Sequence, residues 1–343
     1  MGGFVLVSSM KNEGAFLLEW LAHHRAIGFD DALVFSNDCQ DGTDAMLDRL
    51  AAMGWLTHVP NPGPHAKGPQ WDALKLADDH PRVRGADWLM HLDVDEFVTI
   101  RAGDGRLPAL LAACPTATGF ALTWRMFGNG GVEALEGRLV TETFLRAAPE
   151  VLHWPWRAQM VKTLFRNDGA FRKLGVHRPR SPAPGARPAW VDGAGRLLPP
   201  GFVQGRVFTY PGSAPYALAQ VNHYALGSMQ DYIIKADRGR ANREASGFDL
   251  GYWVDRNFCD AEDRTILRMD PASAPIRAAL LADPVLGPLH RAAQDWRRAR
   301  FAALMAEEPW RALYGRLKMT PPSRALTIAE AQAIRCLAAP GPG

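Results

Sequence analysis

The chain has 343 residues, with 39 basic and 36 acidic side chains and a formal net charge of +3. Apolar residues make up 47% of it, and 15 Phe with 11 Trp supply ample core, which excludes general disorder. The balanced charge argues against a nucleic-acid-binding protein, and the length exceeds the roughly 250–300 residues at which a single core stops growing.

The first hundred residues alternate strand and helix patterns. Apolar runs predict strands over 4–9, 32–35, 55–59 and 88–92, and apolar residues at helical spacing predict helices over 17–27, 43–50 and 70–79. Strands that are continuous apolar runs are typical of a parallel sheet covered on both faces. The order therefore predicts an α/β fold with a mostly parallel sheet flanked by helices.

The rest of the chain is less regular. Residues 119–125 and 161–166 predict further strands, and the chain is mostly helical from about residue 228. Residues 178–201 are rich in Pro and Gly, and we expect an irregular insertion or a mobile loop there. The last residues, 338–343, are expected to be disordered.

Polar clusters follow three of the four early strands, namely Lys11-Asn12-Glu13, Asn37-Asp38 and Asp93-Val94-Asp95. The carboxyl ends of parallel strands meet at one edge of a sheet, where α/β proteins bind their ligands. We therefore expect these clusters to lie together on one rim and to form a binding site.

The third cluster carries a specific chemistry. Asp93 and Asp95 are two residues apart, and in an extended segment their carboxylates would face the same side. Like charges repel unless a cation lies between them, and oxygen ligands favour Mg²⁺ or Mn²⁺ completed by substrate phosphates. A sugar nucleotide, whose leaving group is a nucleoside diphosphate, is one such substrate. In an extended segment the Glu96 side chain would point to the opposite face from that of Asp95, which favours a salt bridge or a backbone cap for Glu96.

Four blocks of the chain resemble glycosyltransferase family 2-like proteins and family 92 glycosyltransferases. They are 10–14 with 19–24, the "DxDEF" motif within 88–97, 124–128 with 142–144, and 222–224 followed by Ser228 and Lys235. The resemblance covers roughly residues 3–240 and implies a GT-A fold that transfers a sugar from a nucleotide donor. One departure is Asn129-Gly130-Gly131-Val132, which stands where these families often have Ser-x-Gly-His.

The resemblance also implies a division of the chain. A GT-A domain would occupy residues 1–240, with a nucleotide-binding half over 1–100 and an acceptor half over 101–240 that includes the Pro-rich loop. A helical region would follow over 241–337.

Roles for single residues follow from the same resemblance. Nucleotide contacts fall on Asn12, Glu13, Asn37 and Asp38, for which helix capping and turn chemistry are the alternatives. Asp93 and Asp95 would bind the metal and the diphosphate, and Lys162 and Lys235 would bind the departing diphosphate. A late histidine, His177 or His223, would complete the metal shell, although a lone histidine is more often structural.

A catalytic base is needed if the enzyme inverts the sugar's stereochemistry, and it is usually a carboxylate. Glu142 matches the family pattern best, with Glu133 and Glu136 as alternatives in a predicted loop. A retaining enzyme would not need this base.

The sequence thus predicts a glycosyltransferase of the hexosyltransferase type that depends on Mn²⁺ or Mg²⁺. Its partners would be a nucleotide-sugar donor and a glycan or glycolipid acceptor, in the assembly of a bacterial surface polysaccharide. Two alternatives remain open: a nucleotidyltransferase that uses the same Asp pair, and a non-catalytic carbohydrate-binding protein on a GT-A fold.

Several features predict a cytoplasmic location. No run of about 18 apolar residues occurs, so we expect no membrane span. The N-terminus reads as a strand rather than a signal peptide, and the four widely spaced cysteines indicate a reducing compartment. Arg- and Trp-bearing helices near 290–316 would suit peripheral contact with the inner face of the membrane, although amphipathic helices usually pack on their own domain.

Overall fold

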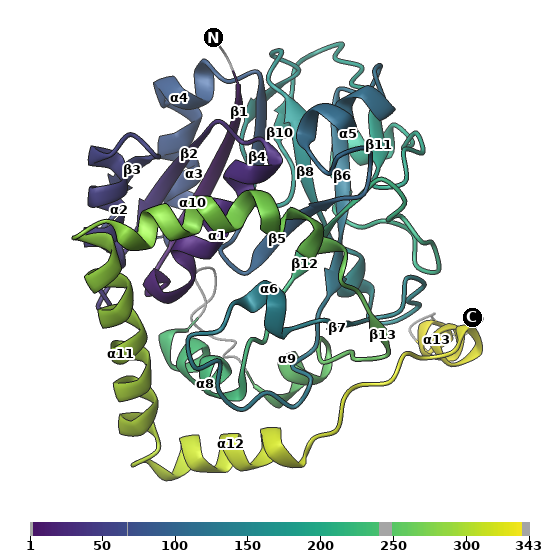
Figure 1. The fold of residues 1–343 in the computed structure, drawn as a ribbon. Coiled ribbons are helices and arrows are strands. Elements are labelled where there is room, and N and C mark those ends of the chain that lie inside the picture. Colours follow the sequence, from purple (N-terminus) through teal and green to yellow (C-terminus); the bar gives the residue numbers. More distant parts are fainter. Residues whose placement is uncertain (1–2, 67, 240–248, 338–343) are drawn as a thin grey trace.

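The computed structural model describes residues 3–66, 68–239 and 249–337 (Figure 1). The tail 338–343, predicted to be disordered, lies outside this range. Within the described residues the main sheet has nine strands in the order β3-β2-β1-β4-β8-β6-β12-β5, with β11 beside β6. Its strands are β1 (Phe4–Met10), β2 (Asp31–Ser36), β3 (Thr57–Pro60), β4 (Trp88–His91), β5 (Glu96–Ile100), β6 (Gly119–Met126), β8 (Val161–Arg166), β11 (Trp190–Asp192) and β12 (Ala219–His223).

The first four strands form the parallel half of the sheet. In β1, Val7 is in register with Leu33 of β2 on one side and with His91 of β4 on the other. The helices between them are α1 (Gly14–Ile27), α2 (Thr43–Ala52), α3 (Pro69–Asp79) and α4 (Pro81–Arg84). Gly28 ends α1 in the left-handed conformation that glycine adopts without strain. The predicted strands and helices of this half are confirmed to within a few residues.

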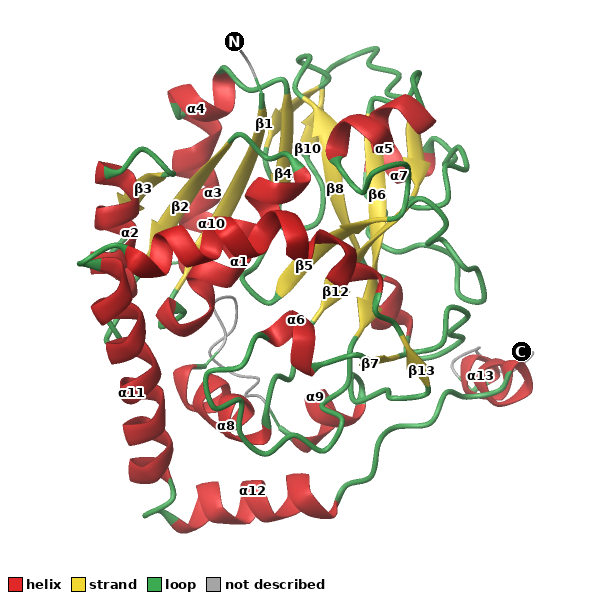
Figure 2. Ribbon diagram, in the orientation of Figure 1, coloured by secondary structure: helices red, strands yellow, loops and turns green. Residues whose placement is uncertain are grey.

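Alternate side chains of these strands enter two separate cores. Leu6 of β1 packs in the core under α1 and α2, whereas its neighbours Val5 and Val7 pack in a second core with Leu74 of α3. Figure 2 shows α1 in front of the sheet, with α10 (Asp270–Ala282) crossing the same face. Because both faces of the sheet are buried, the sequences of these strands are continuous apolar runs.

Antiparallel strands enter the second half of the sheet. β8 runs antiparallel to both β4 and β6, and β12 runs parallel to β6 but antiparallel to β5. Most strand pairs of the sheet are nonetheless parallel, so the predicted α/β class with a mostly parallel sheet is confirmed. The smaller elements here are α5 (Leu107–Ala113), α6 (Val140–Thr143), β7 (Arg146–Ala147), β9 (Phe171–Lys173), β10 (Arg180–Pro182), α7 (Gly201–Gln204), β13 (Ala261–Glu262) and the 3-10 turns Trp156–Gln159 and Thr265–Met269.

The Pro-rich segment 178–201 is more ordered than its sequence predicts. β10 pairs with β9, and β11 joins the main sheet beside β6, where Trp190 is buried. The expectation of an irregular or mobile loop is therefore wrong for these parts. Each strand spans three residues between prolines and glycines, too short a run for the alternation that predicts a strand.

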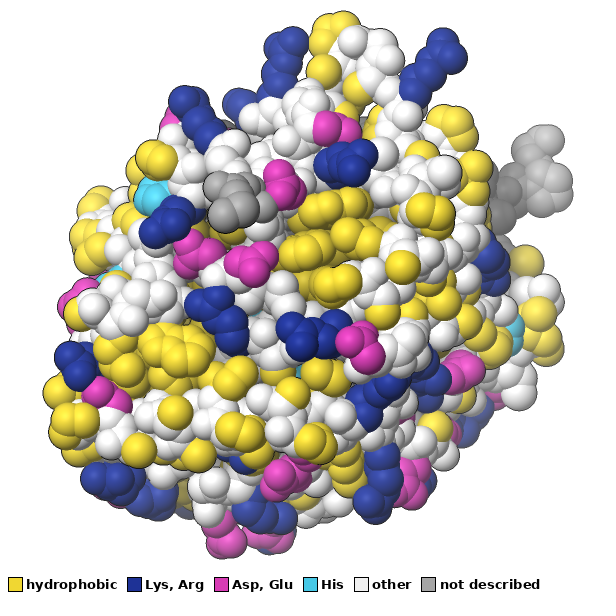
Figure 3. Space-filling view, turned by 45° about the horizontal axis from the view of Figure 1, so that its top comes forward, with side chains coloured by type: hydrophobic (Ala, Val, Ile, Leu, Met, Phe, Trp, Pro, Cys, Tyr) yellow, Lys and Arg dark blue, Asp and Glu magenta, His cyan; other side chains and the backbone are white. Residues whose placement is uncertain are grey.

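The predicted helical C-terminal region is confirmed. After α8 (Met229–Arg238) and α9 (Leu250–Val254) come α10, α11 (Leu286–Leu304), α12 (Glu308–Met319) and α13 (Ile328–Cys336). Phe301 of α11 and Leu313 of α12 pack against a buried cluster that includes Trp253. These helices therefore turn apolar side chains toward the protein's own core. On the face drawn in Figure 3, Lys and Arg lie interspersed with Asp and Glu, as the near-balanced composition suggests.

In the described part of the chain, no helix combines the length with the apolarity that crossing a membrane requires.

Two histidines anchor α1 to β5. Nε2 of His23 donates to the Val98 carbonyl oxygen at 2.8 Å, and Nδ1 of His24 donates to that of Trp20 at 2.8 Å. Nε2 of His24 in turn accepts from the Val98 amide at 3.3 Å, which requires a neutral ring. Burial lowers the pKa of His23 from 6.5 to about 4 and places that of His24 well below 6.5. His24 is thus the core histidine that its place on an apolar helix face indicates.

These two histidines should make the fold sensitive to acid. Because their pKa values are lower in the folded than in the unfolded chain, the unfolded state binds more protons below pH 6.5. We expect the free energy of unfolding to fall by roughly 1.4 kcal/mol per pH unit for each histidine between pH about 6 and about 4. Urea titrations at several pH values would measure this slope. His23→Gln, which keeps a donor for Val98, should make the slope shallower; an unchanged slope would contradict the assignment.

Candidate active site

Asp93 and Asp95 lie in a tight turn between β4 and β5. The Glu96 amide donates to the Asp93 carbonyl oxygen at 3.1 Å, and the Tyr224 amide donates to that of Asp95 at 2.9 Å. The segment is therefore not extended, as the two-residue spacing suggested. Because the chain reverses here, the two carboxylates meet different neighbours.

Asp93 is held by a buried network. Its Oδ2 lies 2.9 Å from Nζ of Lys162, and its Oδ1 accepts from Nε2 of Gln70 at 2.8 Å. Lys162 is fully buried, and its Nζ also lies 2.9 Å from Oε2 of Glu96. Glu96 accepts from the Asp93 amide and from Nε1 of Trp124, both at 2.8 Å. Glu96 thus forms both the salt bridge and the backbone cap that the sequence favoured.

The pKa values of the two carboxyl groups in this network are shifted in opposite directions. Burial alone would raise the pKa of Asp93, but the Lys162 ammonium outweighs burial and holds that pKa well below its usual value. Burial raises the pKa of Glu96 against the opposing effect of Lys162. Since Lys162 is fully buried, it is placed to hold Asp93 rather than to touch a ligand.

Asp95 faces a second lysine and a histidine. Its Oδ2 lies 2.6 Å from Nζ of Lys235, which also donates to the Ala225 carbonyl oxygen at 2.8 Å. Burial would raise the pKa of Asp95, but Lys235 lowers it below its usual value. Nε2 of His223 lies 3.8 Å from the same oxygen. Burial lowers the pKa of His223 to about 3, so its ring is neutral at physiological pH.

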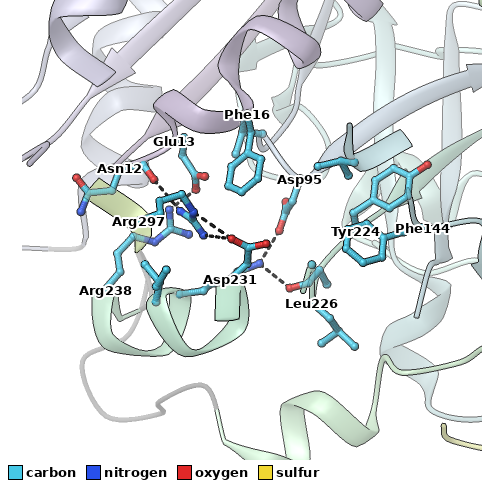
Figure 4. A pocket seen from close by; sticks show the side chains of 16 residues that line it. Asn12, Glu13, Phe16, Asp95, Phe144, Tyr224, Leu226, Asp231, Arg238 and Arg297 are labelled. Atoms are coloured by element: carbon cyan, nitrogen blue, oxygen red, sulfur yellow. Dashed lines mark hydrogen bonds and ion pairs between the residues drawn. The ribbon is translucent and has the colours of Figure 1, made fainter. Parts of the chain in front are cut away.

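A cavity adjoins Asp95 and encloses about 590 Å³ of empty space, part of it open to solvent. One wall carries three ion pairs, Asp95 with Lys235, Glu13 with Arg238, and Asp231 with Arg297. The opposite wall is apolar and includes Phe144 and Tyr224, which lie across the cavity from Asp231 in Figure 4. The cavity therefore offers charge on one side and aromatic surface on the other.

Asp231 and Arg297 of the charged wall come from two helices that are far apart in the chain, α8 and α11. Ser228 and Asp231 form a capping box at the start of α8. Oδ1 of Asp231 lies 3.0 Å from Nε and 2.8 Å from Nη2 of Arg297 on α11. The Ser-x-x-Asp pattern could have singled out Asp231. Nothing local singles out Arg297, because its partner is 66 residues away.

The predicted nucleotide residues lie at the ends of the adjacent strands β1 and β2. Oδ1 of Asn12 accepts from the Gln40 amide at 2.7 Å, which ties the two loops together. Glu13 pairs with Arg238, Asn37 is buried and Asp38 is exposed. The rim is thus assembled as expected, and the nucleotide contacts themselves stay predictions.

Other predicted residues lie further from this cluster. Glu142 is exposed on α6, whereas its neighbours Val140 and Phe144 line the cavity. Its role as catalytic base stays a prediction, and the carboxylates that do line the cavity are Glu13, Asp95 and Asp231.

His177 lies on the β8 side of the site. Its Nδ1 lies 3.1 Å from the Val161 carbonyl oxygen, and its ring centre is 5.3 Å from that of Trp124. Trp124 also contacts His223, with ring centres 4.2 Å apart. The indole thus touches both candidate metal histidines.

Asp95 and His223 offer donor atoms of the kind that a divalent cation binds. Their Oδ2 and Nε2 atoms lie 3.8 Å apart, whereas neighbouring ligands about 2.1 Å from one octahedral ion lie about 3 Å apart, so the two side chains would have to move closer to share a cation. His223 is neutral, and its buried Nδ1 has no hydrogen-bond partner among the described residues. No group of three or more His, Cys, Asp or Glu side chains in the described ranges is arranged to hold a metal. A cation here would therefore take further ligands from substrate phosphates and water, as Mg²⁺ commonly does.

Comparison with known proteins identifies a family. The sequence model of glycosyltransferase family 92 matches residues 6–186, just over half of the chain. A family 92 glycosyltransferase protein of Ricinus communis is 29% identical over 101 residues, which are 29% of this chain and 17% of that protein. The match thus spans less than a fifth of the relative's length.

Solved structures resemble the chain only distantly. S. aureus TarS 1-349 has 13% identity and a TM-score of 0.31, over 49% of this chain and 47% of its own. Its complex with UDP-GlcNAc has 15% identity and a TM-score of 0.28, over 49% and 46%. A mycobacterial protein has 14% identity and a TM-score of 0.28, over 82% and 74%.

Proposed function

The chain belongs to glycosyltransferase family 92, and on that basis we propose that it transfers a sugar from a nucleotide-diphosphate donor to a glycan or glycolipid acceptor. The observation that carries this proposal is the cluster at Asp95. The Asp95 carboxylate and the cationic groups of Lys235 and Arg238 line a largely apolar cavity, and the neutral imidazole of His223 lies 3.8 Å from Asp95. Such a cluster suits a leaving diphosphate beside a sugar.

On the donor side, Asp95 and His223 would hold Mn²⁺ or Mg²⁺, which when bound neutralises the charge of the diphosphate. Lys235 already lies against Asp95, and its ammonium can donate to a phosphate oxygen as the diphosphate departs. Lys162 supports this arrangement from beneath, because it keeps Asp93 ionised and in place.

On the acceptor side, Phe144 and Tyr224 line the cavity but are each only 3% exposed, so they would form an apolar floor beneath the acceptor rather than a stacking surface. Asp231 offers carboxylate oxygens to the acceptor's hydroxyl groups, and Glu13 is kept as a nucleotide contact on the donor side. Glu142 is proposed as the base that deprotonates the acceptor, and the assembly of a bacterial surface polysaccharide is proposed as the setting.

The test combines ligand binding with turnover. The protein is heated with and without Mn²⁺ in the presence of UDP, GDP, CDP or ATP, and its donor is then sought by release of the nucleotide from candidate sugar nucleotides. We expect one diphosphate to stabilise the fold in a metal-dependent way, by about 2.7 kcal/mol at a concentration of about 100 Kd. Stabilisation by ATP alone would favour a nucleotidyltransferase. No stabilisation by any nucleotide would favour a non-catalytic carbohydrate-binding protein.

A further inference from the structure

A cluster of aromatic rings and arginines lies on the surface outside the candidate active site. The Arg157 guanidinium lies 5.1 Å from the Trp156 ring, and the Arg206 guanidinium lies 4.1 Å from the Tyr210 ring. Phe208 joins the two halves, because its ring lies 4.7 Å from Trp156 and its carbonyl oxygen accepts from Nε of Arg206 at 3.0 Å. We call these five residues the arginine–aromatic patch.

The patch is exposed but firmly anchored. Trp156 is 43% and Tyr210 46% exposed, which is unusual for large aromatic side chains. Beneath them Phe202 is fully buried, with its ring 6.3 Å from that of Tyr210 and 5.4 Å from the Arg206 guanidinium. The patch is therefore a preformed surface on a packed base.

The surrounding segment is strongly basic. Residues 151–210 contain ten Lys and Arg, of which Lys162 and Arg178 are buried, but only two Asp and no Glu, although the whole chain is nearly neutral. Within the described residues no ion pair joins Arg157 or Arg206 to a carboxylate. Both guanidinium groups thus keep donors available for an anionic partner.

We propose that the arginine–aromatic patch docks the protein on a membrane surface that exposes anionic phospholipid headgroups. Trp and Tyr favour the headgroup level of a bilayer, and basic side chains bind its phosphates. An anionic glycan is the competing partner, but stacking on a sugar requires an open ring face. Arg157 and Phe208 lie against Trp156, and Arg206 lies over Tyr210. The geometry therefore favours lipid.

Short contacts connect the patch to the candidate active site. Nη1 of Arg178 donates to the Phe202 carbonyl oxygen at 2.6 Å. Oγ1 of Thr163 donates to the carbonyl oxygen of His177, the residue before Arg178, at 3.0 Å. Thr163 is in β8, next to Lys162. Docking at the patch would thus hold β8 and the site close to the membrane surface. The helices α11 and α12 are the poorer docking surface, because apolar side chains of both face inward.

The test measures flotation of the purified protein with vesicles of phosphatidylcholine alone or mixed with phosphatidylglycerol. We expect binding to the mixed vesicles only, weakened by salt. The double variant Arg157→Glu/Arg206→Glu should bind them roughly 100-fold less tightly. The matched control, Arg298→Glu/Arg311→Glu, makes the same change of charge on α11 and α12 and should bind like the parent. A thermal melt of each variant establishes that it is folded.

Three outcomes would overturn the proposal. The patch variant could bind the mixed vesicles as tightly as the parent, or the α11–α12 variant could be the one that loses binding. The parent could also ignore both vesicles and bind a soluble anionic polysaccharide instead, which would assign the patch to a glycan. None of these readouts uses glycosyl transfer, so they stand apart from the outcome of the donor screen.

Discussion

Replacing Asp95 by asparagine is expected to reduce glycosyl transfer by about 1,000-fold and to abolish metal-dependent stabilisation by the nucleotide. Asn keeps the shape of the side chain but removes the charge that faces Lys235 and His223. Loss of one preorganised electrostatic group typically costs 10²–10³-fold, about 3–4 kcal/mol of transition-state stabilisation. Nucleotide release from the donor and thermal shift with Mn²⁺ would measure the two effects.

The fold should survive this substitution. Lys235 keeps its bond to the Ala225 carbonyl oxygen at 2.8 Å, so its ammonium is not left without a partner. Asp295→Asn is the matched control, because Asp295 is an exposed carboxylate paired with Arg298 on α11. It should leave both transfer and nucleotide binding unchanged. If Asp95→Asn bound nucleotide and metal as tightly as the parent, Asp95 would have no part in the donor site.

Replacing Lys162 by methionine is expected to destabilise the fold by about 3–5 kcal/mol, which for a chain of this length lowers Tm by roughly 4–7 °C. Met fills most of the space but leaves Asp93 and the fully buried Glu96 without the ammonium that lies 2.9 Å from each. A buried carboxylate without a counter-charge is among the costliest defects in a core. Urea denaturation at pH 7 would measure the loss. Lys318→Met removes an exposed partner of Glu133 and should cost under about 1 kcal/mol.

The pH dependence would identify the cause of this loss. Without Lys162 the pKa of Asp93 should rise, and that of Glu96, which burial already raises, should rise further. Protonation on going from pH 7 toward 5 should therefore restore part of the stability. The double variant Lys162→Met/Glu96→Gln should also recover part of it at pH 7. A Lys162→Met protein that is as stable as the parent, or that loses more stability in acid, would show that the ion pairs are not what the site depends on.

Much of the fold could be predicted because its signals are local. The apolar runs of β1, β2 and β4 and the C-terminal end of α1 each depend on a few neighbouring residues, and all lie where the sequence predicts them. The two short strands between 180 and 192 were missed because three residues carry too little periodicity. The turn at Asp93–Glu96 was missed because the spacing of the two acids does not determine the backbone between them.

The sequence by itself determined the alternation of strands and helices, the polar clusters at the strand ends and the family resemblance. Only the tertiary structure decided which cation each carboxylate meets: buried Lys162 for Asp93, Lys235 for Asp95 and Arg297 for Asp231. The physical reason is that hydrophobic periodicity is a property of one continuous segment. An ion pair depends instead on how segments that are far apart in the chain pack against one another. The same packing encloses the cavity beside Asp95, which no local pattern indicates.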